Sequence, residues 1–596
     1  MQVPCAMSEI YTGIIWKRHW PIVVIPVFLM LWSRFGAPPL LAYSYQSVTQ
    51  YTGIYRDAAT AGPGGDSIAD QVLIFVVDGL RVDVSRQLPE LNRMRTRGAQ
   101  RVLEVGQPSL SFPGWTAIGT GAWPEQSGVS SNDIKRRIEI DTIFGAARRG
   151  GLDTSIVGSS GWGTLFDQED VKLHVLSEPS VYSSYGDILA FDEQLVEAAR
   201  RVLSLEPELV LIHLPGVDTA GHGYGGDSEE YAQAAVAADL LIAELIGEID
   251  LSKAAVFVTS DHGHIDSGGH GGDEPVVRRV PLVSVGQGIK PGIYADGKQV
   301  DIAATVAVLL GVEIPAHNQG NALLDQIDAP AEFIARRALD VATQLTGRYG
   351  DMLVAIGTST RIEENLLERA EASLAGGDYV DAKKIAREAG DQARGQWQAQ
   401  RGSRLMRERL SRVPIVALCL LPIGVYCVWW RRYGCGLRPP IIGAILFFGL
   451  WHLLFRVRGF SFSASWFNIM PNVFVEARVF DALLALIVVI LIVGALGRGC
   501  GNADVALMAV QTLLLIGAGI AVQIAAFYLA WGVGYDWYLP DLNAGVNYYL
   551  DVAISTIFWP IPVLPFALIL PWMAIVGARV YAVLERLNSR GWCGPP

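Results

Sequence analysis

The chain has 596 residues and a formal net charge of −12, and hydrophobic residues make up 51% of it. This length is too great for one compact domain, and the acidic balance argues against nucleic-acid binding, which normally uses a basic face. Charged residues are frequent from about 65 to 410 and sparse from 413 to 582. The composition therefore predicts a water-soluble domain followed by a membrane domain.

The first segment is predicted to be a membrane anchor. Three basic residues, Lys17, Arg18 and His19, precede an apolar run over residues 20–32. Basic residues beside such a run stay in the cytoplasm, so the chain beyond them crosses the membrane. We assign residues 1–45 to an N-terminal transmembrane anchor. A signal sequence is the alternative, because small residues follow around Ala37 and Ala42.

Residues 65–345 alternate between short apolar strands and helical patterns. Strands are expected over residues 71–77, 209–214 and 255–259, and a helix over residues 229–249. This alternation predicts an α/β fold with a mostly parallel sheet flanked by helices. Ligands of such sheets gather at the carboxyl ends of the strands, and the polar clusters of this chain fall there.

Residues 107–116 are predicted to carry a nucleophile. Ser111 lies just before Pro113, a residue suited to the first turn of a helix. A serine in this place directs its oxygen to where backbone N–H groups favour an anion such as a phosphoryl group. Taken alone, Ser111 would be read as the N-cap of that helix. Ser109 and Thr116 are the rival hydroxyls.

Histidine and aspartate residues cluster further along the chain. Four of the nine histidines lie between residues 222 and 270, beside two aspartates: His222, His262, His264, His270, Asp218 and Asp261. Together with Asp78 they exceed what one tetrahedral ion needs, so two divalent ions are expected. No cysteine lies between residues 51 and 400. The remaining imidazole and carboxylate groups suit zinc, whereas all-oxygen sites would suit magnesium or calcium.

The order of these motifs resembles the alkaline phosphatase superfamily, and within it the type I phosphodiesterase/nucleotide pyrophosphatase branch, over about residues 71–325. The resemblance implies an alkaline-phosphatase-like fold with two zinc ions. One ion would be surrounded by Asp78, Ser111, Asp261 and His262, and the other held by Asp218, His222 and His270. It also implies that Asn132 donates to a phosphoryl oxygen and that Ser111 forms a phosphoseryl intermediate.

Several positions differ from the pattern of this branch. The branch usually has threonine at the position of Ser111 and asparagine at that of Gly114, so the pocket around the phosphate is expected to differ. His264 stands where related chains often have methionine, and we interpret it as lying behind the ligands or at the surface. We interpret His213 as a core histidine of its strand. His174 and His317 carry no functional signal.

The C-terminal part is predicted to be helical. Residues 346–412 are charged and are assigned to a helical stalk, and residues 413–596 to a multi-span transmembrane domain. About five spans are expected, near residues 413–430, 440–455, 480–497, 505–532 and 553–582. Arg431, Arg438 and Arg498 belong on the cytoplasmic side. The catalytic domain is then expected outside the cytoplasm of a cell membrane, although Arg407, Arg409 and Arg412 count mildly against this.

Two enzymatic functions follow from these features. The first is a metal-dependent hydrolase of the phosphodiesterase or nucleotide pyrophosphatase type, acting on a phosphate ester such as a nucleotide or a lipid head group. The alternative is a transferase that moves phosphoethanolamine onto a lipid-linked acceptor, because the membrane layout resembles that of GPI ethanolamine phosphate transferases. Membrane lipid is the other expected partner of the protein. A non-enzymatic membrane scaffold and a sulfatase-like, metal-independent activity rank below them.

Overall fold

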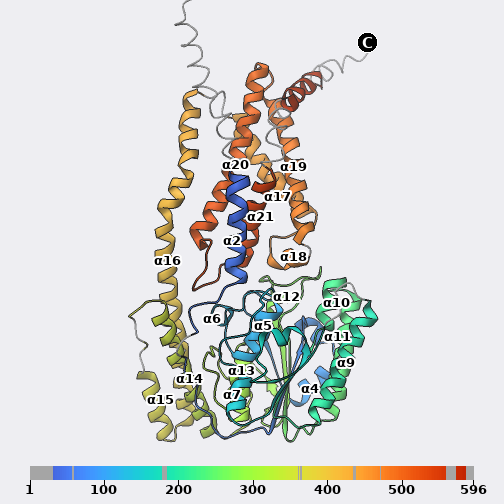
Figure 1. Cartoon of the computed structure of the whole chain (residues 1–596), viewed down its shortest axis with the longest axis vertical. Coiled ribbons are helices and arrows are strands. Elements are labelled where there is room, and N and C mark those ends of the chain that lie inside the picture. Colours follow the sequence, from blue (N-terminus) through green and yellow to red (C-terminus); the bar gives the residue numbers. More distant parts are fainter. Residues whose placement is uncertain are drawn as a thin grey trace, which may run out of the picture.

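The protein has an α/β part and a bundle of long helices above it (Figure 1). The computed structural model describes residues 31–56, 59–177, 184–359, 362, 365–433, 438–469, 471–558 and 572–584. Most of the predicted N-terminal anchor, including its basic residues and residues 20–30, lies outside this range. Within the range, the N-terminal region forms η1 (Trp32–Gly36) and α2 (Ala37–Thr49).

The α/β part is built on one nine-stranded sheet. The strand order is β4-β3-β5-β1-β6-β7-β2-β8, and β9 also pairs with β2. The first five strands in that order run parallel, while β7 runs antiparallel to β6 and to β2. The predicted α/β fold with a mostly parallel sheet is confirmed. The strands are β1 (Gln71–Val77), β2 (Ala99–Glu104), β3 (Thr154–Ser159), β4 (Lys172–Leu176), β5 (Leu209–Leu214), β6 (Ala254–Thr259), β7 (Arg279–Gly286), β8 (Gly292–Ile293) and β9 (Gly297–Lys298).

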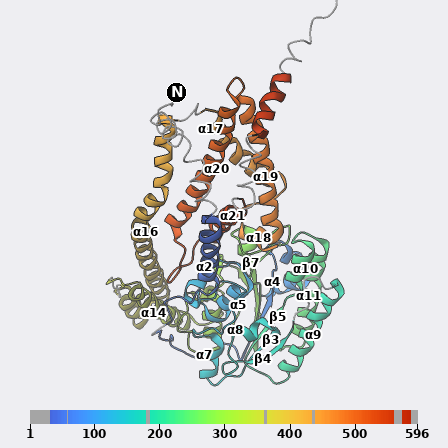
Figure 2. The same cartoon turned by 45° about the horizontal axis from the view of Figure 1, so that its top comes forward.

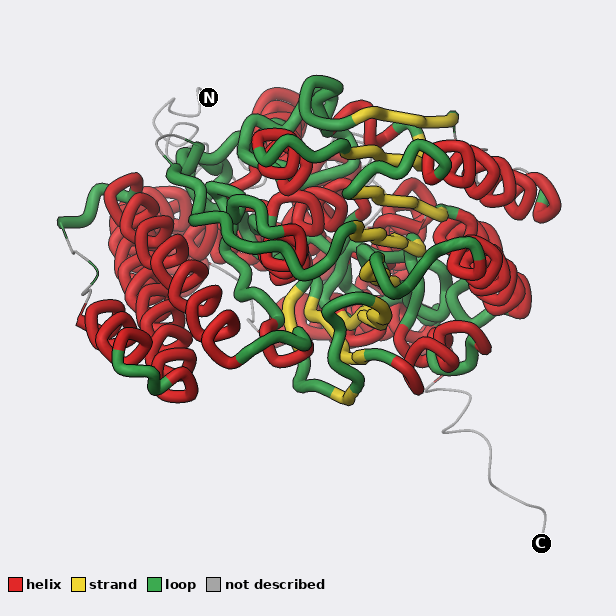
Figure 3. Tube along the Cα trace, turned by 90° about the horizontal axis from the view of Figure 1, so that it is seen from below, coloured by secondary structure: helices red, strands yellow, loops and turns green. Residues whose placement is uncertain are grey.

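Helices cover both faces of this sheet because its central strands are apolar on both faces. Successive side chains of a strand point to opposite faces. In β1, Val72 and Ile74 accordingly join one buried cluster, while Leu73 and Phe75 join another. Figure 3 shows the strands between two groups of helices.

The helices of the α/β part differ in length and position. The long helices α9 and α11 pack on one face of the sheet, whereas α5, α7 and α13 pack on the other. Their bounds are α3 (Val82–Ser85), α4 (Pro89–Arg97), α5 (Ser111–Thr120), α6 (Pro124–Ser127), α7 (Ile143–Arg149), α8 (Gly161–Leu165), α9 (Tyr185–Leu203), α10 (Gly216–Tyr224), α11 (Glu229–Gly247), α12 (Pro275–Arg278), α13 (Asp301–Leu310) and η2 (Leu324–Gln326).

The segment predicted as a stalk packs along the side of the α/β part. It includes the end of α14 (Ala331–Ala355), α15 (Asn365–Ala375) and the first half of α16 (Tyr379–Tyr433), which continues unbroken into the bundle. Trp397 and Leu405 of α16 are buried in the same cluster as residues of β1. The ring of Trp397 meets that of Tyr55 edge-on, with centroids 5.6 Å apart.

Among the described residues, four helices are long and apolar enough to cross a membrane, which indicates a membrane protein. They are the second half of α16, α17 (Arg438–Val457), α19 (Pro471–Leu496) and α20 (Asn502–Trp531). They correspond to the first four predicted spans. The fifth prediction, residues 553–582, includes residues 559–571, which lie outside the described range. The described residues on either side form α21 (Leu542–Phe558) and a shorter apolar helix (Trp572–Leu584).

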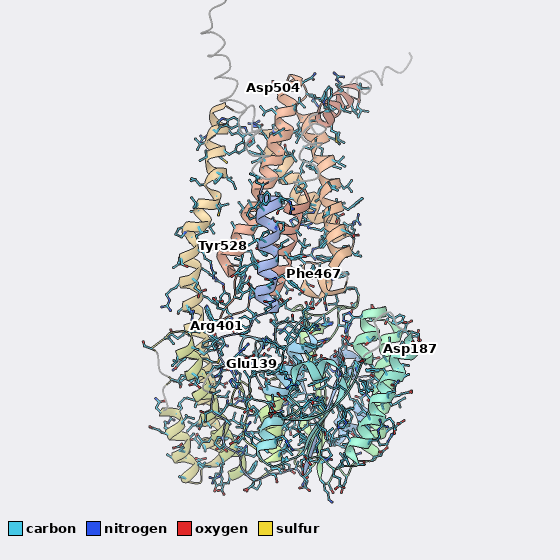
Figure 4. The ribbon with its side chains drawn as sticks, viewed as in Figure 1. Glu139, Asp187, Arg401, Phe467, Asp504 and Tyr528 are labelled. Atoms are coloured by element: carbon cyan, nitrogen blue, oxygen red, sulfur yellow. The ribbon has the colours of Figure 1, made fainter. Side chains whose placement is uncertain are left out.

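The two parts meet through connections between the long helices. The short helix α18 (Ala464–Ile469) lies between α17 and α19, and residues 532–541 connect α20 to α21. The hydroxyl of Tyr55 donates to the carbonyl of Trp537 at 2.8 Å, and Arg412 donates to the hydroxyl of Tyr538 at 2.8 Å. Figure 2 shows α18 against the α/β part, and in Figure 4 Phe467 of α18 lies near the boundary while Asp504 marks the far end.

Leu405→Ala is expected to lower the stability of the protein, because Leu405 of α16 is buried against the α/β part. Removing such a side chain costs about 2–5 kcal/mol. Leu410→Ala is the matched control, since Leu410 on the same helix is exposed, and its effect should stay below about 0.5 kcal/mol. Thermal unfolding of the full chain in detergent measures both. Equal melting temperatures for the two variants would contradict the packing of α16 on the α/β part.

Candidate active site

Three carboxylates meet at one edge of the sheet. Asp78 directly follows β1, Asp261 follows β6 after one intervening residue, and Asp218 lies in the first turn of α10 after β5. Because β5, β1 and β6 are parallel neighbours, their carboxyl ends lie side by side. The sheet order thus brings together residues that are far apart in the sequence.

The first cluster contains Asp78, Asp261 and His262, whose ligand atoms lie within 4.8 Å of one another. The Nε2 atom of His262 lies 3.3 Å from Oδ1 of Asp78 and 3.5 Å from Oδ2 of Asp261. Asp261 is further fixed by the indole N–H of Trp115, which donates to its Oδ2 at 2.9 Å. Three of the four residues predicted around the first ion, Asp78, Asp261 and His262, are therefore adjacent and buried.

The second cluster contains Asp218, His262, His264 and His270, again within 4.8 Å. The predicted ligand His222 lies beside it: its Nε2 is 2.9 Å from Nε2 of His270 and 3.6 Å from Oδ2 of Asp218. The structure thus brings Asp218, His222 and His270 together as predicted. It also adds His264, whose Nε2 is 2.7 Å from Oδ1 of Asp218.

The surface alternative for His264 is wrong, because this residue is fully buried. Gly79, which has a φ of 72°, approaches it so closely that a Cβ at Gly79 would lie 2.8 Å from the His264 ring. The backbone at this point therefore needs glycine. The contact of His264 with Asp218 can orient that carboxylate.

His213 has a role beyond the core position expected for it. It is fully buried on β5, as expected, but its Nε2 also lies 2.9 Å from Oδ2 of Asp78. Burial lowers the pKa of His213 to about 3, so the ring is neutral and its Nε2–H donates to the carboxylate. Such outer contacts orient metal ligands. The alternation of side chains along β5 cannot show from the sequence that His213 contacts Asp78.

The donor chemistry of the clusters fits divalent metal ions. Nδ1 of His270 lies 3.1 Å from the carbonyl oxygen of Ser109. A carbonyl only accepts hydrogen bonds, so Nδ1 carries the proton and Nε2 of the neutral ring presents a lone pair toward the cluster. Burial lowers the pKa of His222 and His270, which keeps both rings in the neutral form that binds metal. Nitrogen and carboxylate donors in this arrangement suit zinc.

Ser111 lies at the edge of the first cluster, at the start of α5. Its Oγ is 3.3 Å from Nε2 of His262 and 3.4 Å from Nδ2 of Asn132. The side-chain oxygen of Asn132 accepts from the backbone N–H of Phe112 at 3.0 Å. This contact turns the amide nitrogen of Asn132 toward Ser111, so the structure places both predicted catalytic residues together.

The rival hydroxyls point elsewhere. Ser109 donates to the carbonyl of Gly272 at 2.7 Å, a contact that holds the loop carrying His270. Thr116 is fully buried inside α5, and its hydroxyl has no hydrogen-bond partner among the described residues. The geometry thus favours Ser111. At Gly114, an added Cβ would lie 2.9 Å from Cβ of Asp261, so the asparagine common in related chains would not fit here without a shift.

A helix of the membrane part also reaches this site, which the sequence analysis did not anticipate. Nδ2 of Asn468 on α18 lies 3.4 Å from Nε2 of His270. The hydroxyl of Ser465 accepts from the backbone N–H of Gly272 at 2.9 Å and donates to Glu274 at 2.8 Å. A Cβ at Gly269 would lie 2.1 Å from the carbonyl oxygen of Ser465. The glycine-rich loop around His270 is thus shaped to receive α18.

Known proteins are similar in sequence to the α/β part of this chain. The family model described as type I phosphodiesterase / nucleotide pyrophosphatase matches residues 72–144 and 166–275. The protein named GPI ethanolamine phosphate transferase 1 of Emericella nidulans is 26% identical over 347 residues, 48% of this chain and 37% of that protein. The protein of the same name from Mus musculus is 26% identical over 333 residues, 47% of this chain and 35% of that protein. The match therefore spans little more than a third of these relatives.

Solved structures also align with the chain at low identity. Alkaline phosphatase PafA aligns with a TM-score of 0.36 at 13% identity, over 44% of this chain and 100% of that chain. Murine ectonucleotide pyrophosphatase / phosphodiesterase 5 aligns with a TM-score of 0.36 at 14% identity, over 43% of this chain and 100% of that chain.

The fold, the buried clusters and the family match together define a membrane protein with a phosphoryl-transfer fold. The resemblance to the alkaline phosphatase superfamily is confirmed, and the chain is similar over its catalytic part to type I phosphodiesterases and to GPI ethanolamine phosphate transferases.

His213→Ala is expected to weaken metal binding without removing a ligand, because Asp78 loses the partner that orients it. Loss of such a contact costs roughly 10- to 100-fold in metal affinity. Competition with a chelator, followed by elemental analysis of the protein, measures this affinity. His174→Ala is the control, since His174 is exposed on the edge strand β4. Unchanged affinity in His213→Ala would show that the contact between His213 and Asp78 does not support metal binding.

Proposed function

We propose that this protein is a membrane-bound transferase that moves a phosphoethanolamine-type group from a phospholipid to a hydroxyl of a lipid-linked acceptor. The contact between α18 and the loop of His270 is the observation that carries this proposal. Because α18 connects two of the four apolar helices, reactants held in a bilayer would reach the clusters without leaving it. The names of the relatives support the same reading.

The proposed reaction has two displacements at phosphorus. The Oγ of Ser111 attacks the phosphorus of the donor phosphodiester, and the bond to the lipid oxygen breaks. The proton of Ser111 ends on the released lipid alcohol. The hydroxyl of the acceptor then attacks the phosphoseryl group, the bond to Ser111 breaks, and the proton of the acceptor returns to Oγ of Ser111. The net change is one phosphodiester exchanged for another.

The residues around Ser111 would hold the transferred group. The amide nitrogen of Asn132, which lies 3.4 Å from Oγ of Ser111, would donate to a phosphoryl oxygen of that group. Two zinc ions, held by Asp78, Asp261 and His262 and by Asp218, His222 and His270, would lower the pKa of the Ser111 hydroxyl and offset charge at phosphorus. Trp115, His213 and His264 would keep the carboxylates in place.

The proposed location is a cell membrane, with the catalytic part, residues 65–345, outside the cytoplasm. The basic residues Arg431, Arg438 and Arg498 flank the ends of α16, α17 and α19 that are far from the catalytic part. By the positive-inside rule these ends face the cytoplasm. Arg409 and Arg412, near the catalytic part, donate to the carbonyl of Ala530 and to Tyr538, so they have structural partners there.

A phosphodiesterase or nucleotide pyrophosphatase-type hydrolase is the second candidate, because the family model that matches carries that description. In a hydrolase, water replaces the acceptor in the second displacement and needs no access from the bilayer. A hydrolase would not need the contact between α18 and the loop of His270. We therefore prefer the transferase.

The full chain in detergent is expected to move the labelled head group of phosphatidylethanolamine to a lipid-linked glycan, with far less release to water. Ser111→Ala should lower transfer by at least about 10³-fold, because the nucleophile is lost. Ser111→Thr keeps a hydroxyl and should retain transfer. Chromatography of the labelled products measures both outcomes. Rapid release of phosphoethanolamine in the absence of acceptor would support the hydrolase instead.

A further inference from the structure

A second polar site lies inside the helix bundle, apart from the metal clusters. A cavity of about 430 Å³ is lined by residues of α17, α19, α20 and α21, near the ends of these helices that face the α/β part. This volume is in the range of small-molecule sites. Its polar lining comes from His452, Arg478, Gln523, Asn547, Tyr548 and Asp551.

Arg478 supplies a buried positive charge to this cavity. The side chain is 2% exposed. Its guanidinium lies over the ring of Trp451, 3.4 Å from the centroid, and donates to the carbonyl of Trp451 at 3.1 Å and to His452 at 3.2 Å. Its Nε atom has no hydrogen-bond partner among the described residues. A buried arginine with a spare donor is a ready site for a phosphate oxygen.

Asp551 supplies a buried carboxyl group to the same cavity. Its carboxylate accepts from the amide of Gln523 at 2.8 and 3.1 Å when that amide nitrogen points toward it. In the described part of the chain, no ion pair joins Arg478 and Asp551 directly. The stacked rings of Phe527 and Tyr548, with centroids 4.3 Å apart, also line the cavity, and aromatic faces attract organic cations.

Charged residues among membrane helices are costly and usually mark a functional site. Here a guanidinium and a carboxyl group line one cavity without an ion pair between them, beside aromatic rings. We propose that this cavity binds the head group of a zwitterionic phospholipid, with the phosphate against Arg478 and the ammonium group against Asp551 and the aromatic rings. The acyl chains would lie along the apolar surfaces of the surrounding helices.

This site is linked to the metal clusters through the segment that carries α18. The guanidinium of Arg478 lies 4.9 Å from the ring centroid of Phe462, which precedes α18. The backbone N–H of Ala464, the first residue of α18, donates to the side chain of Asn543 at the start of α21 at 2.9 Å. A lipid bound here would therefore lie next to the segment that contacts His270. The inference goes beyond the proposed function, since lipid binding here does not require transfer.

Lipid retention by the full chain tests this site. Ser111→Ala serves as the parent, so that turnover does not consume the lipid. The parent is incubated in detergent with phosphatidylethanolamine and phosphatidylglycerol of matched acyl chains, and native mass spectrometry measures the bound lipid. The parent should retain phosphatidylethanolamine at least tenfold over phosphatidylglycerol. Arg478→Gln should lose retention at least tenfold, and Asp551→Asn should abolish the preference for the zwitterionic lipid.

Two matched variants act as controls. Arg498→Gln and Asp504→Asn change the same residue types at the far end of the bundle and should leave lipid retention unchanged. Arg478→Lys keeps the charge and should retain more lipid than Arg478→Gln, which separates loss of the charge from misfolding. Soluble glycerophosphoethanolamine should compete only weakly if the acyl chains contribute to binding. Equal lipid composition in the parent, Arg478→Gln and Asp551→Asn would overturn the proposal.

Discussion

Burial of charge at the carboxyl ends of three parallel strands is the constraint on which the rest of the site depends. Asp78, Asp218 and Asp261 come together because β5, β1 and β6 are neighbours. Buried carboxylates need hydrogen-bond partners. Asp78 contacts His213, Asp218 contacts His264, and Asp261 accepts from the indole of Trp115. The carboxylate oxygens and the imidazole nitrogens of each cluster lie within 4.8 Å of one another. A divalent cation would stabilise this arrangement.

The second organising feature is the contact between the helix bundle and the catalytic part. Ser465 and Asn468 of α18 touch the loop of His270, while residues 532–541 contact the α/β part near Tyr55. The bundle therefore does more than anchor the catalytic part, because one of its connections borders the reacting groups. The cavity around Arg478 lies on the other side of the same connection. In the proposed function, reactants held in the membrane would reach the clusters along this connection.

The sequence predicted the features that depend on local pattern. Strands such as Gln71–Val77 are continuous apolar runs, and the glycine-rich segments with Asp218 or His262 follow them. It did not predict His213 as a partner of Asp78, because one histidine within an apolar strand looks the same whether it faces a carboxylate or the core. The role of α18 was also missed, since residues 465 and 272 meet only after the bundle has docked. His264 was ambiguous because its burial depends on close approach at Gly79.

Direct detection of the covalent intermediate tests the central claim, that Ser111 carries the transferred group. The full chain would be mixed with phosphatidylethanolamine labelled in its head group, quenched in acid and digested, and the peptides examined by mass spectrometry. The account predicts phosphoethanolamine on the peptide with Ser111, lost rapidly when a lipid-linked acceptor is added and slowly in its absence. Absence of the adduct, with transfer proceeding at its normal rate in Ser111→Ala, would contradict the account.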